Sequence, residues 1–167
     1  MAAWGADARY TRLVVRHEKT LLRLALLLTR NREDAEDVVQ DALLSVANSW
    51  SATNPTHGLA YLRRSVANRA IDISRQRRET ASAEIPETAE DDLGFLRHES
   101  DQAFFALVTT LPPRQQHTLV LRYYADLDDR QIAKILGISP GTVRSQATHA
   151  LAKLRTSTPP VSERYAR

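Results

Sequence analysis

Apolar residues recur every three or four positions through most of this chain, which is the spacing of amphipathic helices. Stretches of this kind lie on both sides of a central segment where the period is lost and acidic residues accumulate. The pattern therefore predicts an all-α fold of two small helical domains, residues 8–78 and 100–156. A flexible acidic linker over residues 79–99 is predicted to join them.

The clearest predicted elements are two short helices in the last third of the chain. Asp128 can cap the first helix together with Gln131 in a reciprocal capping box, and Gly137 supplies the sharp turn that follows. Ser139 suits the cap of the second helix, and Pro140 suits its first position, where a missing N–H costs nothing. Together these features predict a helix-turn-helix, an arrangement that binds duplex DNA.

The second of these helices has a predicted inner face and a predicted outer face. The apolar, inward positions are Val143, Ala147, Ala150, Leu151 and Leu154. The outward positions in the N-terminal half of this helix are Arg144, Ser145, Thr148 and His149. The N-terminal half of a recognition helix enters the major groove, so these four side chains are placed to meet base edges and phosphates. A helical hairpin with a solvated face is the alternative. The helix caps, the glycine turn and the apolar stripe all favour a helix-turn-helix over one continuous stretch.

A helix predicted after Asn31 combines an apolar face with an acidic face. The acidic face is formed by Asp34, Asp37, Gln40 and Asp41. Leu44 lies one turn beyond as an exposed apolar residue. A solvated surface with one stray leucine explains this pattern. A docking surface for a basic helical partner explains it too, with the leucine as a desolvated anchor and the carboxylates as steering charges. Spacing alone leaves both interpretations open.

A third helix, predicted from about residue 58 to residue 78, carries a basic stripe with an aromatic residue in it. The stripe and its tail contain Tyr61, Arg63, Arg64, Asn68, Arg69, Arg75, Arg77 and Arg78. Cations for phosphates and a flat ring for an unstacked base are what single-stranded or partly melted nucleic acid requires. The polar loop SATNPTHG before this helix supports the interpretation, because Asn and Thr side chains can read an extruded base. A solvated arginine helix is the alternative.

Composition narrows the classes of function. The net charge of +3 and the pI near 9.5 indicate a mild attraction to polyanions. The chain has no cysteine, which excludes disulfides and thiolate zinc sites, and no catalytic triad, metal cluster or Gly-rich phosphate loop is recognisable. We therefore expect no catalysis, no cofactor and no metal. The apolar stretch from Leu21 to Leu28 is interrupted by Arg23, so a cytoplasmic protein without membrane insertion is expected.

The order of these motifs resembles the extracytoplasmic-function (group 4) sigma factors of bacterial RNA polymerase, most closely the SigE-like actinobacterial type. In the N-terminal domain the resemblance rests on DAEDVVQDALLSV and GLAYLRRSVANRAIDISRQRR. In the C-terminal domain it rests on LPPRQQ, LVLRYY, QIAKILGISPGTVRSQ and ALAKLR. It covers nearly all of the chain from Arg9 to Arg155. The resemblance implies a factor that directs promoter-specific transcription initiation by binding core polymerase and recognising the -10 and -35 elements.

The same resemblance implies roles for individual residues. Docking on the clamp coiled coil of the polymerase β′ subunit falls to Asp37, Gln40, Asp41 and Leu44. Capture and melting of the -10 element fall to Asn54, Thr56, His57, Tyr61, Arg64 and Asn68. Reading of the -35 element falls to Arg144, Ser145, Thr148 and His149. The β flap of the polymerase, promoter DNA and an anti-sigma factor are the further partners that the family leads one to expect.

Two other functions stay open on the residues alone. An autonomous helix-turn-helix regulator would bind a two-fold symmetric operator as a dimer, with residues 1–78 as a sensing or dimerisation domain. A protein-binding helical module would no longer read DNA. The acidic linker and the basic stripe argue against both, because a dimer interface should be more apolar than the segment from Arg63 to Arg78.

Overall fold

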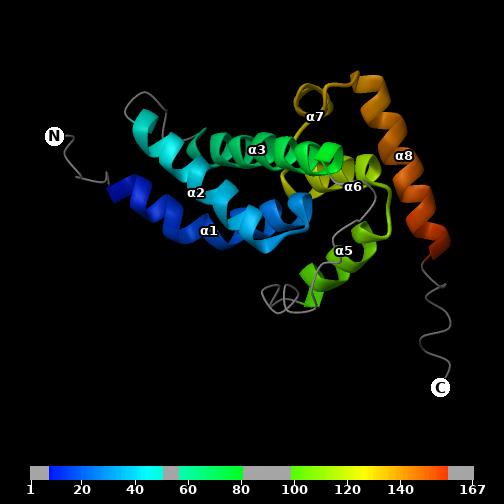
Figure 1. The fold of residues 1–167 in the computed structure, drawn as a ribbon, viewed down its shortest axis with the longest axis horizontal. Coiled ribbons are helices and arrows are strands. Elements are labelled where there is room, and N and C mark those ends of the chain that lie inside the picture. The colour runs from blue at the N-terminus through cyan, green and yellow to red at the C-terminus, as the bar shows by residue number, and fades with distance from the viewer. Residues whose placement is uncertain (1–7, 51–56, 81–98, 158–167) are drawn as a thin grey trace. The chain divides into compact units, whose positions relative to one another are not determined.

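The computed structural model describes residues 8–50, 57–80 and 99–157, and in these ranges the regular elements are helical (Figure 1). They are α1 (Ala8–Thr29), α2 (Arg32–Ser49), α3 (Gly58–Thr80), α5 (Glu99–Thr109), α6 (Pro113–Leu119), the π-helical segment η3 (Val120–Tyr124), α7 (Asp129–Leu136) and α8 (Pro140–Ser157). The chain divides into two compact units, with α1, α2 and α3 in the first and α5 to α8 in the second. The predicted all-α fold of two helical domains is therefore confirmed.

The helices of the first unit lie side by side, and each of the three packs against both of the others (Figure 1). Its core includes the buried side chains Leu21, Leu24, Leu28, Val38, Val46, Leu62, Val66 and Ile71. Complete burial of one such side chain contributes about 1.5–3 kcal/mol. Each helix of this unit therefore turns an apolar face inward, as the helical period requires.

Polar contacts join the start of α2 to the end of α3. Asn31 caps α2, because its side-chain oxygen accepts a hydrogen bond from the backbone N–H of Asp34 at 2.9 Å. The Asp34 carboxylate in turn accepts a hydrogen bond of 2.9 Å from Arg77, which lies in the last turns of α3. The start of α2 and the end of α3 are therefore joined through a side chain whose own backbone position is fixed by the cap.

The start of α3 is packed closely against an aromatic pair. The rings of Tyr10 and Trp50 lie 5.2 Å apart between centroids, and the Tyr10 hydroxyl donates to the Leu43 carbonyl oxygen at 2.6 Å. Burial raises the pKa of Tyr10. A Cβ atom at Gly58 would lie 3.0 Å from both the Trp50 ring and the Leu13 side chain, so glycine permits the close approach. The beginning of α3 is consequently fixed against the end of α2.

The second unit has its own core, built where α8 packs on α6 and α7. This core contains Leu111, Leu119, Ala147 and Ala150, with Leu151 and Leu154 packed against it at its edge. The small residues Ala147 and Ala150 on α8 let this helix pack closely on Leu119 at the end of α6. The inward face predicted for α8 is therefore the face that holds it in the unit.

The helix-turn-helix is bounded as the sequence predicts. The Asp128 carboxylate accepts from the Gln131 N–H at 2.9 Å, and the Gln131 side chain accepts from the Asp128 N–H at 3.0 Å, which completes a capping box. Gly137 ends α7 at φ 66°, a left-handed conformation that glycine adopts without a steric penalty. Ser139 accepts a hydrogen bond of 3.1 Å from the Thr142 N–H at the start of α8. Both helices thus begin on side-chain caps.

One element was not predicted. The helix that begins at Pro113 changes from α to π geometry at Val120, where the Ala125 N–H donates to the Val120 carbonyl oxygen at 3.0 Å. Asp126 follows with φ 57°, and the chain then enters α7. A π-helical turn contains an extra residue, so it changes the direction in which later side chains point. Arg122 lies within this segment.

The predicted linker is bordered by longer helices than expected. α3 continues two residues past its predicted end, to Thr80, and α5 begins at Glu99, so both helices extend into the segment assigned to the linker over residues 79–99. Residues 81–98 lie outside the described part of the chain. Among the helices that the structure describes, none has the length and apolar character needed to cross a membrane.

Candidate DNA and polymerase interfaces

The four residues predicted to read duplex DNA lie on the outer face of α8. Arg144, Ser145, Thr148 and His149 are all exposed. The opposite face of α8 is buried in the core of the unit, so the exposed face has a rigid support. The Thr148 hydroxyl donates to the Arg144 carbonyl oxygen at 3.0 Å, which turns its oxygen partly toward the helix backbone. The arrangement is that of a recognition helix with an arginine one turn inside its N-terminus.

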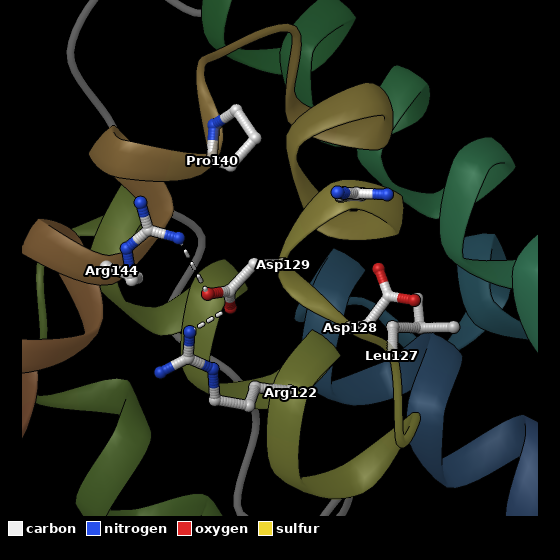
Figure 2. Close-up of a pocket in the computed structure, with 7 residues that line it drawn as sticks. Arg122, Leu127, Asp128, Asp129, Pro140 and Arg144 are labelled. Atoms are coloured by element: carbon white, nitrogen blue, oxygen red, sulfur yellow. Dashed lines mark hydrogen bonds and ion pairs between the residues drawn. The ribbon is translucent and has the colours of Figure 1, made fainter.

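Arg144 has an acidic neighbour that the sequence analysis missed. Its guanidinium Nη1 lies 3.7 Å from Oδ2 of Asp129, the first residue of α7. The other carboxylate oxygen of Asp129 forms an ion pair with Arg122, which lies on the π-helical segment (Figure 2). The carboxylate of Asp129 therefore contacts two arginines, Arg144 on α8 and Arg122 on the π-helical segment.

An open depression of about 660 Å³ lies next to this cluster. It is lined by Arg122, Leu127, Asp128, Asp129, Arg130, Pro140 and Arg144. Figure 2 shows the carboxylate of Asp129 between the guanidinium groups of Arg122 and Arg144. The depression thus lies beside the start of α7 and the start of α8, and Arg144 is one of the residues that line it.

The residues predicted to dock on the polymerase share the exposed face of α2. Asp37, Gln40, Asp41 and Leu44 are all exposed, and the side chain of Leu44 retains 52% of its accessible surface. Asp41 has a neighbour on α3, since its Oδ2 lies 3.5 Å from Nη2 of Arg69. Asp34, which the period also assigned to the acidic face, is instead engaged by Arg77 and mostly buried. The acidic surface is therefore smaller than the sequence predicts.

The residues predicted to bind the -10 element are only partly covered by the structure. Tyr61, Arg64 and Asn68 are exposed on α3 at spacings of three and four residues, and His57 is exposed immediately before the helix. Asn54 and Thr56 lie outside the described residues. Among the arginines of the predicted basic stripe, Arg69 and Arg77 are paired with carboxylates of α2. The stripe consequently carries less free positive charge than its composition suggests.

The surroundings of His17 disfavour its charged form. Burial, with smaller contributions from the charges of Arg16 and Arg63, lowers the pKa of His17 below its ordinary value of 6.5. Within the described residues, no group of three or more His, Cys, Asp or Glu side chains is placed to hold a metal ion.

Comparison with known proteins identifies the family. The family Sigma-70 region 2 matches residues 13–80, and the family Sigma-70, region 4 matches residues 101–154. The RNA polymerase sigma-E factor of Streptomyces avermitilis is 30% identical over 156 residues, which are 92% of this chain and 87% of the relative. The chain belongs to the extracytoplasmic-function sigma factors of SigE type. Sigma factors are transcription initiation factors, and this sigma factor directs promoter-specific initiation.

Further relatives agree with the assignment. The sigma factor is 29% identical over 157 residues to the ECF RNA polymerase sigma factor SigM of Mycobacterium tuberculosis, covering 92% of this chain and 80% of SigM. Among solved structures, CnrH in complex with the cytosolic domain of CnrY aligns with a TM-score of 0.56 and 24% identity, over 88% of this chain and 85% of CnrH. This likeness shows the fold. Regions 2 and 4 coincide with the first and second units of the sigma factor.

Proposed function

We propose that this sigma factor binds core RNA polymerase through the exposed face of α2 and promoter DNA through α3 and α8. The observation that best supports the proposal is the two-sided construction of α8. One side of this helix is buried among Leu111 and Leu119, while the other presents the four residues predicted to read DNA. A helix that is held rigidly from behind can place side chains in the major groove with little loss of conformational entropy.

The docking face combines an apolar anchor with steering charge. Leu44 is exposed at the C-terminal end of the helix surface on which Asp37 and Asp41 are also exposed. Desolvation of a leucine at an interface supplies affinity, and surrounding carboxylates accelerate encounter with a basic partner. We assign Asp37, Gln40, Asp41 and Leu44 to the β′ clamp coiled coil and the second unit to the β flap.

The two DNA-binding surfaces would act together. On α3, Tyr61 offers a ring for an unstacked base, and Arg64 offers a cation for a phosphate. Asn68, His57 and the loop residues Asn54 and Thr56 complete the -10 surface, and α8 reads the -35 element. Because both units belong to one chain and both would be held on one polymerase, two weak contacts become one avid contact. The protein acts in this way without catalysis or cofactor, in the cytoplasm, under control of an anti-sigma factor.

The test is run-off transcription with purified core RNA polymerase and a library of promoter fragments. We expect specific transcripts with the wild-type protein and a loss of at least roughly tenfold with Asp41→Arg or Arg144→Ala. Two matched controls carry the same changes elsewhere. Glu18→Arg reverses an exposed acidic charge on α1, and Arg155→Ala truncates an exposed arginine three turns farther along α8. Both controls should transcribe like the wild type.

A binding assay separates the two surfaces. Asp41→Arg should lose core polymerase, whereas Arg144→Ala should keep core polymerase and lose the promoter. Transcripts that survive both substitutions would contradict the assigned surfaces. Absence of any transcript, together with tight binding of duplex DNA by the protein alone, would indicate an autonomous regulator instead.

A further inference from the structure

We infer that Asp129 is a positioning residue that sets the base specificity of the recognition helix. Its carboxylate holds the guanidinium of Arg144 in the orientation from which Arg144 reads a base of the upstream promoter element. The inference rests on the proposed role of α8. It adds a residue outside the recognition helix that determines which base is preferred, without contacting DNA for that purpose.

The carboxylate of Asp129 is itself held in place. Oδ1 pairs with Arg122 and Oδ2 faces Arg144, so the two arginines use different oxygens (Figure 2). The side chains of Asp129 and Arg122 are 26% and 25% exposed, which makes their pair the more protected of the two. An ion pair that is shielded from water is screened less than one at the surface. Arg122 therefore fixes the carboxylate, and the carboxylate then orients Arg144.

The backbone on both sides of the pair is fixed as well. The capping box formed by Asp128 and Gln131 sets the position of the first turn of α7, and Asp129 is the first residue of that turn. Arg122 lies on the π-helical segment, and its side chain reaches the first residue of α7. A carboxylate is also favoured at a helix N-terminus by the helix dipole. The acid therefore has one well-defined position relative to α8.

Arg144 is constrained but remains available. Its side chain is 65% exposed, and 3.7 Å is an ion-pair distance without a close hydrogen bond. An arginine that swings freely must lose side-chain entropy on binding DNA, and it can satisfy several bases in different rotamers. An arginine restrained from one side loses less entropy and reaches fewer positions. The pair thus favours one base edge over its competitors.

The charge of Asp129 also affects the general affinity for DNA. A carboxylate beside a DNA-facing arginine repels phosphates, which weakens binding to every sequence alike. Specificity is a difference between affinities, so this common penalty cancels, and the discrimination comes from the orientation of Arg144. Removal of the charge should therefore raise binding to all sequences, while release of Arg144 lowers selectivity.

The experiment is a transcription selection with reconstituted holoenzyme. Core RNA polymerase is combined with wild-type protein, Asp129→Asn, Arg144→Ala or Asp126→Asn, and each holoenzyme transcribes a library whose upstream promoter element is randomised. Sequencing of the transcripts gives the preference at each base position. Asp126→Asn removes the same charge three residues away, from a residue outside the cluster whose left-handed backbone also suits asparagine.

We expect Asp129→Asn to flatten the preference at the same base positions that Arg144→Ala affects, by about 5- to 10-fold. Transcription from unrelated sequences should rise at the same time. Arg122→Gln removes the ion pair that fixes the Asp129 carboxylate. This variant should reduce the base preference at the same positions, but to a smaller extent. Asp126→Asn should keep the wild-type preferences.

Each contrary outcome has a separate meaning. If Arg144→Ala changes the preferences and Asp129→Asn does not, the inference about Asp129 is wrong and the proposed role of α8 stands. If Asp129→Asn lowers transcription from all sequences equally, its role is only structural and the inference is again wrong. If Arg144→Ala leaves the preferences unchanged, the assignment of α8 to the upstream element fails, and the inference fails with it.

Discussion

The carboxylate of Asp41 on α2 lies 3.5 Å from the guanidinium of Arg69 on α3. Both side chains are more than half exposed, so the pair contributes little to stability, about 0–1 kcal/mol. Its position is more informative than its strength. It joins the surface proposed to bind polymerase to the helix proposed to bind melted DNA, and it neutralises an acid of the docking face before any partner arrives.

Removal of this neutralising charge should strengthen docking. We expect Arg69→Gln to raise the affinity for core polymerase roughly two- to fivefold at low ionic strength, because Asp41 is then free to attract a basic partner. Titration of labelled protein with core polymerase at several salt concentrations measures the effect, which should shrink as salt increases. The double variant Asp41→Asn/Arg69→Gln should lose the gain. A lower affinity of Arg69→Gln would show that Arg69 itself contacts the polymerase.

Truncation of Leu44 should separate binding from stability. We expect Leu44→Ala to weaken binding of core polymerase by roughly tenfold, as loss of an apolar anchor does. Its free energy of unfolding should change by less than about 0.5 kcal/mol, because the side chain is exposed. Val15→Ala on α1 is the matched control, since Val15 is 75% exposed and lies outside the proposed docking face. Equal losses of polymerase binding in the two variants would argue against a specific anchor.

Gly58 should not tolerate a methyl group. We expect Gly58→Ala to lower the free energy of unfolding by about 1–3 kcal/mol, because the added Cβ would press on the Trp50 ring and on Leu13. Gly141→Ala is the contrasting change. There the Cβ would meet only the Ser139 hydroxyl at 3.7 Å, and alanine should stabilise α8 by about 0.5–1 kcal/mol. Urea unfolding followed by circular dichroism measures both. Equal effects of the two substitutions would contradict the packing described at the start of α3.

His17 should make the first unit less stable in mild acid. Because its pKa is lowered in the folded chain, the unfolded chain takes up a proton first as the pH falls below 6.5, and this favours unfolding. The loss grows until the pH passes below the lowered pKa and is then constant. We expect the wild type to lose more thermal stability than His17→Gln between about pH 7.5 and about pH 5.5. A parallel loss in the two proteins would show that other groups cause it.

The helix-turn-helix could be predicted from the sequence because each of its signals is local. Asp128 and Gln131 are three residues apart, Gly137 marks one helix end, and Ser139 caps the next helix start. A helix cap or a left-handed glycine depends on neighbours within a few residues, so the sequence around it carries the information. The outer face of α8 followed directly from the helical period.

The contacts of Asp129 with Arg122 and Arg144 could not be predicted in this way. Arg122, which pairs with Asp129, lies on the π-helical segment, and nothing in LVLRYY distinguishes a π turn from an α turn. Asp34 shows the same limit, since it fits the exposed period of α2 and yet pairs with Arg77, which lies 43 residues away. The width of the buried face of α3 is a further example, since this helix packs against two others and buries both Ala70 and Ile71.

Each unit of this sigma factor carries its own buried core, one around Leu62 and one around Leu119. A mutation that unfolds the second unit therefore need not unfold the first. Such a protein would still occupy polymerase molecules through α2 but could not bring them to a promoter. In a cell that also makes the intact protein, loss of the recognition unit should be dominant, whereas loss of the docking unit should be recessive.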